Sequence, residues 1–257
     1  MNTLEIDLLH LLFGFALILI PLYIFWHYKT KMITTILLSL ARMTIQLFCV
    51  GFYLNYLFEK DSFLINIAWV VLMILVATQT AIKRTGLSWR VVALPIGIAF
   101  ASALTLVACY FLGIVIQLDS IFSARYFIPI CGILLGNMLS ANVIALNHYC
   151  ENIKREQTYY YYLLGNGATE KEALSPFIRS ALIHAFNPII ANVAVMGLVS
   201  LPGTLIGQII GGSSPNTSIR YQIMIILITF TASTLSVVLS IHFSSRKLFD
   251  TYGRIQF

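Results

Sequence analysis

Residues 91–117 read VVALPIGIAFASALTLVACYFLGIVIQ, a run that contains no charged side chain. A helix needs about 20 apolar residues to cross the hydrocarbon core of a bilayer, which is about 30 Å thick. Apolar residues follow one another in this run instead of alternating with polar ones, which is not the pattern of a transmembrane β-strand. The stretch therefore predicts a membrane-spanning helix, and it decides the fold class of the chain.

Similar apolar runs occupy most of the remaining sequence. Hydrophobic residues make up 59% of the chain and charged residues 10%, whereas a soluble domain carries about 25% charged residues. We expect an all-α polytopic membrane protein that forms one transmembrane domain over residues 1–257 and is surrounded by lipid. About seven spans are predicted, at 8–27, 33–58, 62–82, 91–117, 126–146, 189–210 and 219–243. The first lacks the basic region and cleavage motif of a signal peptide, so we interpret it as retained.

The Lys and Arg residues are divided unevenly between alternate loops. One set of loops carries twelve of them, and the opposite set carries Lys60, Arg125 and Arg220. Cytoplasmic loops retain positive charge, so the pattern places the N-terminus outside and the C-terminus in the cytoplasm. The net charge of +6 is thus explained by topology, and no nucleic-acid partner is expected, because the basic residues are not clustered.

With this orientation, residues 147–188 form the largest cytoplasmic segment, and a helical hairpin is predicted within it. Gly165 and Gly167 indicate a turn, and Thr169 followed by Glu172 is a capping-box pattern that starts the next helix. Such a hairpin either rests on the membrane or docks a soluble partner.

Polar residues inside the predicted spans are candidates for a transport pathway, because lipid disfavours them. In 33–58, Arg42 and Gln46 share one helical face with other polar side chains, although Arg42 alone could extend to the membrane surface. In 126–146 the candidate is Asn137, beside a GxxxG pattern at Gly132 and Gly136. Small hydroxyls in 219–243 are interpreted as helix packing: Thr229, Ser233, Ser236 and Ser240.

The run 189–210 departs most from a simple helix. Proline removes a backbone donor and glycine permits positive φ, so a kinked or broken helix is expected near Pro202. In transporters such breaks line a cavity or act as a hinge, and close glycine packing is the alternative. The candidate residues are Ser200, Pro202, Gly203, Gly207 and Gln208.

Evidence for a metal site in the sequence is weak. The four cysteines form no CxxC pair, and His148, Cys150 and Glu151 are the only ligand-type cluster that we identify. His148 and Cys150 are two residues apart and do not share a helical face. We therefore expect no metal held by the chain itself.

Several of these segments resemble a known family. The matching stretches are RMTIQLFCVGFYLNYLF at 42–58, LLGNGATEKEALSPFIRSA at 163–181, GLVSLPG at 197–203, GQIIGGSSP at 207–215 and RYQIMI at 220–225. They are similar to the FetB (YbbM) type of ABC permease, a bacterial family associated with metal export that includes plant proteins for aluminium tolerance.

This resemblance implies a permease of the bacterial inner membrane that works as a dimer with a separate ATPase and exports iron, a related metal or a metal-linked solute. It also implies that the turn resembling the EAA loop couples to the ATPase through Leu164, Gly165, Gly167, Ala168, Thr169, Glu172 and Ala173. Members carry paired methionines after SLPG, where this chain has Thr204 and Leu205.

Energy for transport has to come from outside the chain. ATP hydrolysis requires GxxxxGK[ST], and Gly207 to Gly212 is followed by Ser213 and Ser214 instead of lysine. We expect no cofactor on this chain, with ATP on the partner. A secondary carrier is the alternative, and an enzyme is not expected, because HExxH and intramembrane aspartate pairs are absent from the sequence.

Overall fold

The computed structural model describes residues 8–250, and this range is built from helices. The chain divides into two compact units. One contains the N-terminal residues up to Lys60 together with Ile210–Ser213, and the other contains Asp61–Ile209 and the residues from Ser214 onward. Each unit is described by itself.

The N-terminal unit contains α1 (Leu8–Ala16), α2 (Leu19–His27) and the long α3 (Ile33–Lys60). The predicted span 8–27 is interrupted at Leu17 and Ile18, where the Leu17 amide bonds the Gly14 carbonyl at 3.3 Å in a tighter turn. Pro21 accounts for the interruption, since a proline ring clashes with the carbonyl four residues before it. A single helix over 8–27 is therefore wrong, whereas α3 contains the predicted span 33–58.

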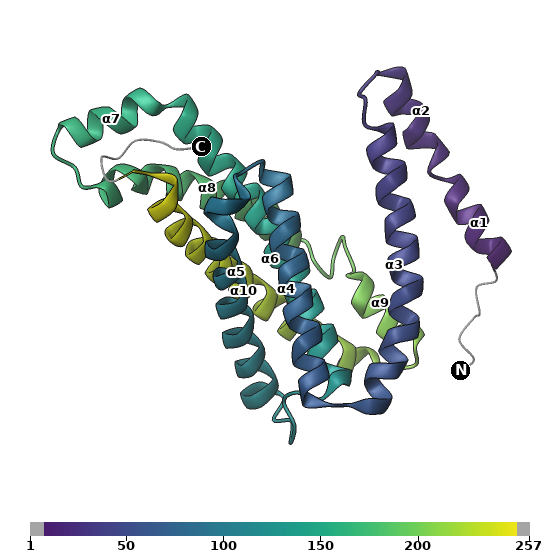
Figure 1. The fold of residues 1–257 in the computed structure, drawn as a ribbon. Coiled ribbons are helices and arrows are strands. Elements are labelled where there is room, and N and C mark those ends of the chain that lie inside the picture. Colours follow the sequence, from purple (N-terminus) through teal and green to yellow (C-terminus); the bar gives the residue numbers. More distant parts are fainter. Residues whose placement is uncertain (1–7, 251–257) are drawn as a thin grey trace. The chain divides into compact units, whose positions relative to one another are not determined.

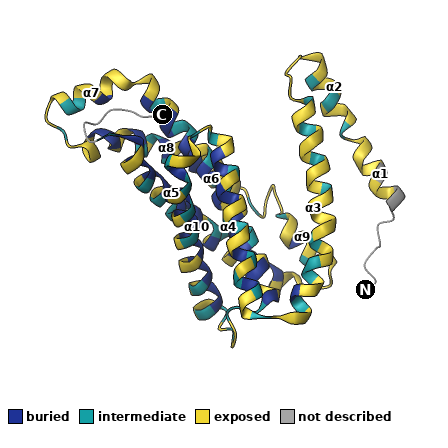
Figure 2. Ribbon diagram, viewed as in Figure 1, coloured by how far each residue is buried: buried dark blue, intermediate teal, exposed yellow. Residues whose placement is uncertain are grey.

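Four long helices form the core of the second unit (Figure 1). They are α4 (Phe63–Thr85), α5 (Trp89–Tyr110), α6 (Ala124–Arg155) and α10 (Pro215–Leu248), and α5 continues as a π-helical turn, η1 (Phe111–Val115). Small residues such as Ala81, Ala145 and Ala232 are fully buried where the helices meet, which permits close approach of the backbones. Buried residues are concentrated on these helices (Figure 2).

Neither end of the predicted cytoplasmic segment 147–188 coincides with the end of a helix in the structure. α6 continues to Arg155, α7 (Gln157–Gly165) follows it, and α8 (Glu170–Ala194) runs through Pro188 without ending. A single span over 189–210 is consequently wrong. Its first residues belong to α8, and its last form the short α9 (Gly203–Ile210).

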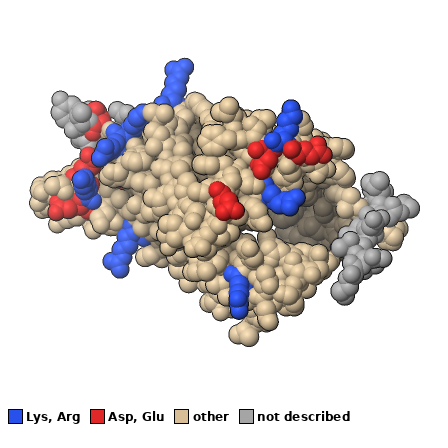
Figure 3. All heavy atoms as spheres, turned by 90° about the horizontal axis from the view of Figure 1, so that it is seen from below, with Lys and Arg blue, Asp and Glu red and all other residues tan. Residues whose placement is uncertain are grey.

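Six helices within residues 8–250 are long and apolar enough to cross a membrane: α3, α4, α5 with η1, α6, α8 and α10. The stretch Phe13–His27, which includes the end of α1 and all of α2, is apolar but shorter. Charged side chains are few among uncharged ones on the face seen in Figure 3. The chain is an all-α, multi-pass membrane protein.

Candidate functional site

The interruption predicted near Pro202 is present between α8 and α9. The chain turns at Gly197, whose φ is +89°, and the Gly197 amide donates to the Ser200 carbonyl at 2.9 Å. Pro202 then precedes the first residue of α9, Gly203. A backbone that leaves the helix at membrane depth has polar groups that water or protein must satisfy.

A cavity of about 300 Å³ lies beside this interruption and is lined by residues of α6, α8, α9 and α10. The Thr204 hydroxyl donates to the Gln222 side-chain oxygen at 2.6 Å, which joins the start of α9 to α10. Gln222 is only 9% exposed. The polar side chains that line the cavity are Asn137, Asn192, Thr204, Gln222, Thr229 and Ser233.

The chemistry of this wall is neutral and rich in oxygen. Amide and hydroxyl oxygens can replace part of the hydration shell of a hard cation, and Met196 adds one thioether. Polar groups at this depth mark substrate pathways in membrane proteins. The arrangement can hold a small polar or cationic solute between the helices.

The structure brings only part of the predicted pathway residues to this cavity. Asn137 lines it, and Pro202 lines a neighbouring apolar cavity of about 490 Å³ that also includes Gln222. Ser200, Gly203, Gly207 and Gln208 line neither cavity. A Cβ built on Gly203 or Gly207 would meet no atom within 4 Å, so close glycine packing is not found at these positions in the described chain.

Arg42 and Gln46 belong to α3, in the N-terminal unit, and both side chains are exposed. The salt bridge recorded among residues 8–250 joins Arg155 to Glu156. No carboxylate partner for Arg42 is therefore found in that range, and the pathway role of this pair stays a prediction.

Sequence reasoning missed most of the cavity wall. Asn192 and Gln222 are amides inside apolar runs, and this position alone could have identified them as candidate pathway residues. Thr229 and Ser233 were assigned to helix packing, but they face the cavity. The same assignment is confirmed for Ser236, which accepts a hydrogen bond from Asn142 on α6 at 2.8 Å.

The turn between α7 and α8 has the conformation that its sequence predicts. The Ala168 amide bonds the Leu163 carbonyl at 3.1 Å and the Gly167 amide bonds the Leu164 carbonyl at 3.0 Å, with Gly167 at φ +89°. This pair of bonds is a Schellman motif, which requires a left-handed residue after the helix.

The predicted capping box at the start of α8 is confirmed. The Thr169 amide and hydroxyl donate to the Glu172 carboxylate at 2.8 and 2.7 Å, and the Glu172 amide donates back to the Thr169 hydroxyl at 3.4 Å. Gly165, Gly167, Thr169 and Glu172 are exposed, whereas Ala173 is fully buried. Ala173 therefore contributes packing and offers no surface to a partner.

One tyrosine of the run 159–162 fixes α7 in place. Tyr160 is fully buried, and its ring lies 6.4 Å from that of Phe177 on α8 and 5.4 Å from that of Phe249. Burial raises the pKa of Tyr160 to about 12. Its neighbours in the run are exposed, so the outer face of α7 remains aromatic.

The weak metal candidates do not form a site. Cys150 is buried, Glu151 is exposed, and His148 bonds Ser180 on α8. Residues 8–250 contain no group of three or more His, Cys, Asp or Glu side chains placed to hold a metal.

The long apolar helices and the interrupted helix between them define the chain as a multi-pass α-helical membrane protein. The chain belongs to the family described as Uncharacterised protein family (UPF0014), which it matches over residues 8–249.

Curated relatives cover nearly the whole chain. It is 28% identical to the UPF0014 membrane protein YjkA of Bacillus subtilis, over 97% of this chain and 98% of that protein. It is 31% identical to the probable iron export permease protein FetB of Escherichia coli, over 92% and 90%. It is also 28% identical to the protein ALUMINUM SENSITIVE 3 of Arabidopsis thaliana, over 85% and 78%. No solved structure matches the chain.

Proposed function

We propose that this chain is the transmembrane permease subunit of an ABC transporter that exports iron, a related metal ion or a metal-linked solute. The observation that carries the proposal is the polar cavity at the α8–α9 interruption, which offers oxygen ligands inside an apolar bundle. A relative with 31% identity is named as a probable iron export permease. In this proposal iron is the transported cargo, and the cavity is a binding site along the transport pathway.

The energy source is a separate ATPase subunit, and the α7–α8 turn is its docking element. The turn is exposed, is held by two backbone hydrogen bonds, and leads through Tyr160 and Phe177 into α8. When the ATPase moves this turn, α8 transmits the movement to the interruption between α8 and α9, since a packed helix moves as a rigid element. The chain itself acts as a transporter subunit and not as an enzyme.

The working unit is a homodimer in the bacterial inner membrane, with the N-terminus outside. Asn192 and Thr204 line the cavity but are exposed, so the walls contributed by α8 and α9 are open on one side. A second copy would close the path with protein, because polar groups of this kind do not face lipid.

Co-reconstitution with the partner ATPase tests the proposal. The chain should copurify with a P-loop ATPase, and vesicles that contain both should move iron(II) only when ATP is supplied. Gly165→Trp places a bulky side chain on the exposed turn, where a Cβ meets no atom within 4 Å. It should weaken copurification and leave membrane insertion intact. Tyr162→Trp, on the exposed face of α7, is the matched control.

Transport that persists in vesicles without any ATPase contradicts the ABC assignment and favours a secondary carrier. Full coupling in Gly165→Trp moves the docking element to another part of the chain.

A further inference from the structure

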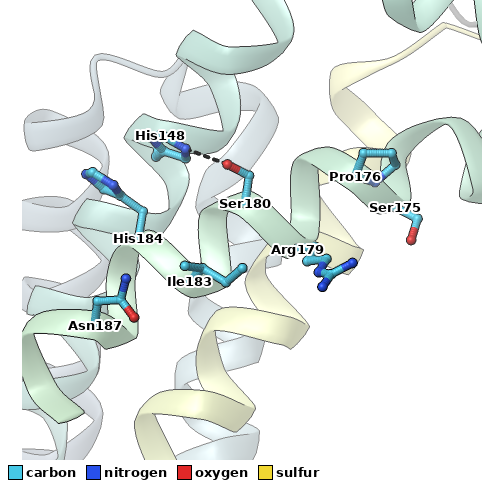
Figure 4. Close-up of a pocket in the computed structure, with 8 residues that line it drawn as sticks. All are labelled: His148, Ser175, Pro176, Arg179, Ser180, Ile183, His184 and Asn187. Atoms are coloured by element: carbon cyan, nitrogen blue, oxygen red, sulfur yellow. Dashed lines mark hydrogen bonds between the residues drawn. The ribbon is translucent and has the colours of Figure 1, made fainter.

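A second pocket of about 460 Å³ opens between α6 and α8, and it shares no residue with the polar cavity. Figure 4 shows its lining side chains: His148 from α6 lies beside His184, and Arg179, Ile183 and Asn187 follow one another along α8. Ser175 and Ser180 supply hydroxyls. The proposed transport function leaves this pocket without a role.

The two histidines are stacked on each other and are not arranged to share a metal ion. Their rings stack with centroids 4.3 Å apart and planes only 9° from parallel. A metal ion lies in the plane of each imidazole that binds it, about 2 Å from the nitrogen, and two parallel rings do not share such a position. His148 Nε2 is 2.9 Å from the Ser180 hydroxyl, which fixes the ring of His148 against α8.

The pocket is positive and lacks a carboxylate among its lining residues. Arg179 has no salt bridge among residues 8–250, where the recorded pair is Arg155–Glu156. Glu151 lies one turn beyond His148 on α6 but does not line the pocket. A guanidinium presents two parallel N–H groups that match the oxygens of a phosphate, and the hydroxyls and the Asn187 amide add neutral donors.

The position along α6 places the pocket close to the membrane surface. His148 is six residues before Lys154 and seven before Arg155, which end the helix. At about 1.5 Å per residue, His148 is roughly 10 Å along the helix from these charged residues. Phosphate groups of lipids lie in this interfacial zone, and basic pockets between membrane helices bind anionic headgroups there.

We propose that the His148–Arg179–His184 pocket binds a phosphate group, carried either by an anionic phospholipid or by a molecule in solution. Arg179 provides the charge, Ser175, Ser180 and Asn187 orient the phosphate oxygens, and the stacked histidines form the wall on the α6 side.

Binding to the full-length purified chain tests this proposal. Phosphatidylglycerol, phosphatidylcholine and inorganic phosphate are titrated separately, with bound ligand counted by native mass spectrometry. Arg179→Gln should weaken phosphate-group binding about tenfold or more, as expected when a hydrogen bond to a charged group is lost. Arg179→Lys keeps the charge without the planar fork and should give an intermediate value.

Lys171→Gln is the matched control, because Lys171 is an exposed cation on α8 that does not line the pocket. Selective retention of phosphatidylglycerol that depends on Arg179 identifies a lipid site, and retention of inorganic phosphate with the same dependence identifies a site for a soluble ligand. Equal binding by Arg179→Gln and Lys171→Gln, or no preference for phosphatidylglycerol over phosphatidylcholine together with no phosphate binding, overturns the proposal.

Discussion

Two asparagines on α6, five residues apart, have different environments. Asn142 is fully buried and its amide donates to the Met138 carbonyl and the Ser236 hydroxyl, each at 2.8 Å. Asn137 is exposed, bonds back to the Ile133 carbonyl at 2.8 Å, and lines the polar cavity. The first joins two helices, and the second lines a cavity. In a membrane protein the residue type alone does not separate these roles, whereas the helical face does.

The largest effect on stability is expected at the buried asparagine. Asn142→Ala removes the bond to α10, so the buried Ser236 oxygen loses the hydrogen bond that Asn142 donates to it. This loss costs about 1–3 kcal/mol of unfolding free energy. Asn137→Ala should stay within about 0.5 kcal/mol, as exposed substitutions do. Denaturation of both variants in mixed detergent micelles measures the difference. Equal losses would contradict the division between a packing face and a cavity face.

A second contrast concerns the two glycines of the α7–α8 turn. Gly167 has φ +89°, so Gly167→Ala should destabilise the turn by about 1–2 kcal/mol. Gly165→Ala should be neutral or slightly stabilising, because Gly165 ends α7 in a helical conformation with free space around it. Hydrogen exchange of residues 157–175 reports on both. Faster exchange in Gly165→Ala than in Gly167→Ala would show that the Schellman motif does not hold this turn.

A smaller, pH-dependent effect is expected at Asp61. Its carboxylate accepts hydrogen bonds from the Ala124 amide at 2.6 Å and from the Ser123 hydroxyl at 3.2 Å. The Ala124 bond is the main reason that the pKa of Asp61 is lowered. A lowered folded-state pKa contributes stability above the unfolded value of about 4, and this is lost as pH falls through the folded value.

Unfolding measured between pH 6 and pH 3 should therefore show less acid sensitivity in Asp61→Asn than in the wild type. Asp119→Asn is the control, since it removes one exposed carboxylate elsewhere in the same unit. Identical pH profiles for wild type and Asp61→Asn would show that the bond from the Ala124 amide, at the first residue of α6, does not stabilise the fold.

The smallest effect is expected where a buried polar group has no partner. The Tyr160 hydroxyl makes no hydrogen bond among residues 8–250, so Tyr160→Phe should cause no loss of stability. Tyr161→Phe is the reference, since it removes an exposed hydroxyl that accepts a long bond of 3.4 Å from Gln157. A loss above about 1 kcal/mol in Tyr160→Phe relative to Tyr161→Phe would show that this hydroxyl is bonded in the native protein.

Much of the fold could be predicted from the sequence, because apolar runs report directly on helices in lipid. The spans 33–58, 62–82 and 91–117 correspond to α3, α4 and α5 with η1. The failures have two causes. Pro21 interrupts the first run, and Pro188 was taken as the end of a cytoplasmic segment although α8 passes through it. Proline in a membrane helix is tolerated when neighbouring groups satisfy the freed carbonyl.

Less of the candidate site could be predicted, because it is formed by tertiary structure. Asn137 and Gln222 are 85 positions apart in the chain and line the same cavity. Periodicity identifies the face of one helix but does not show which faces of distant helices meet. The α7–α8 turn was predicted more fully, since the glycine at positive φ and the capping box are local signals.

The central claim is that cargo passes the polar cavity under control of a separate ATPase. The most direct test is ATP-driven iron(II) transport by vesicles that contain the ATPase with wild type, Asn137→Ala or Gln222→Leu. Ser240→Ala is the control, since Ser240 is buried on α10 and does not line the cavity. We predict that the two cavity variants lose transport about tenfold, as removal of one contact to the cargo implies, while Ser240→Ala retains it. Unchanged transport in both cavity variants, or transport without ATP, would contradict the account.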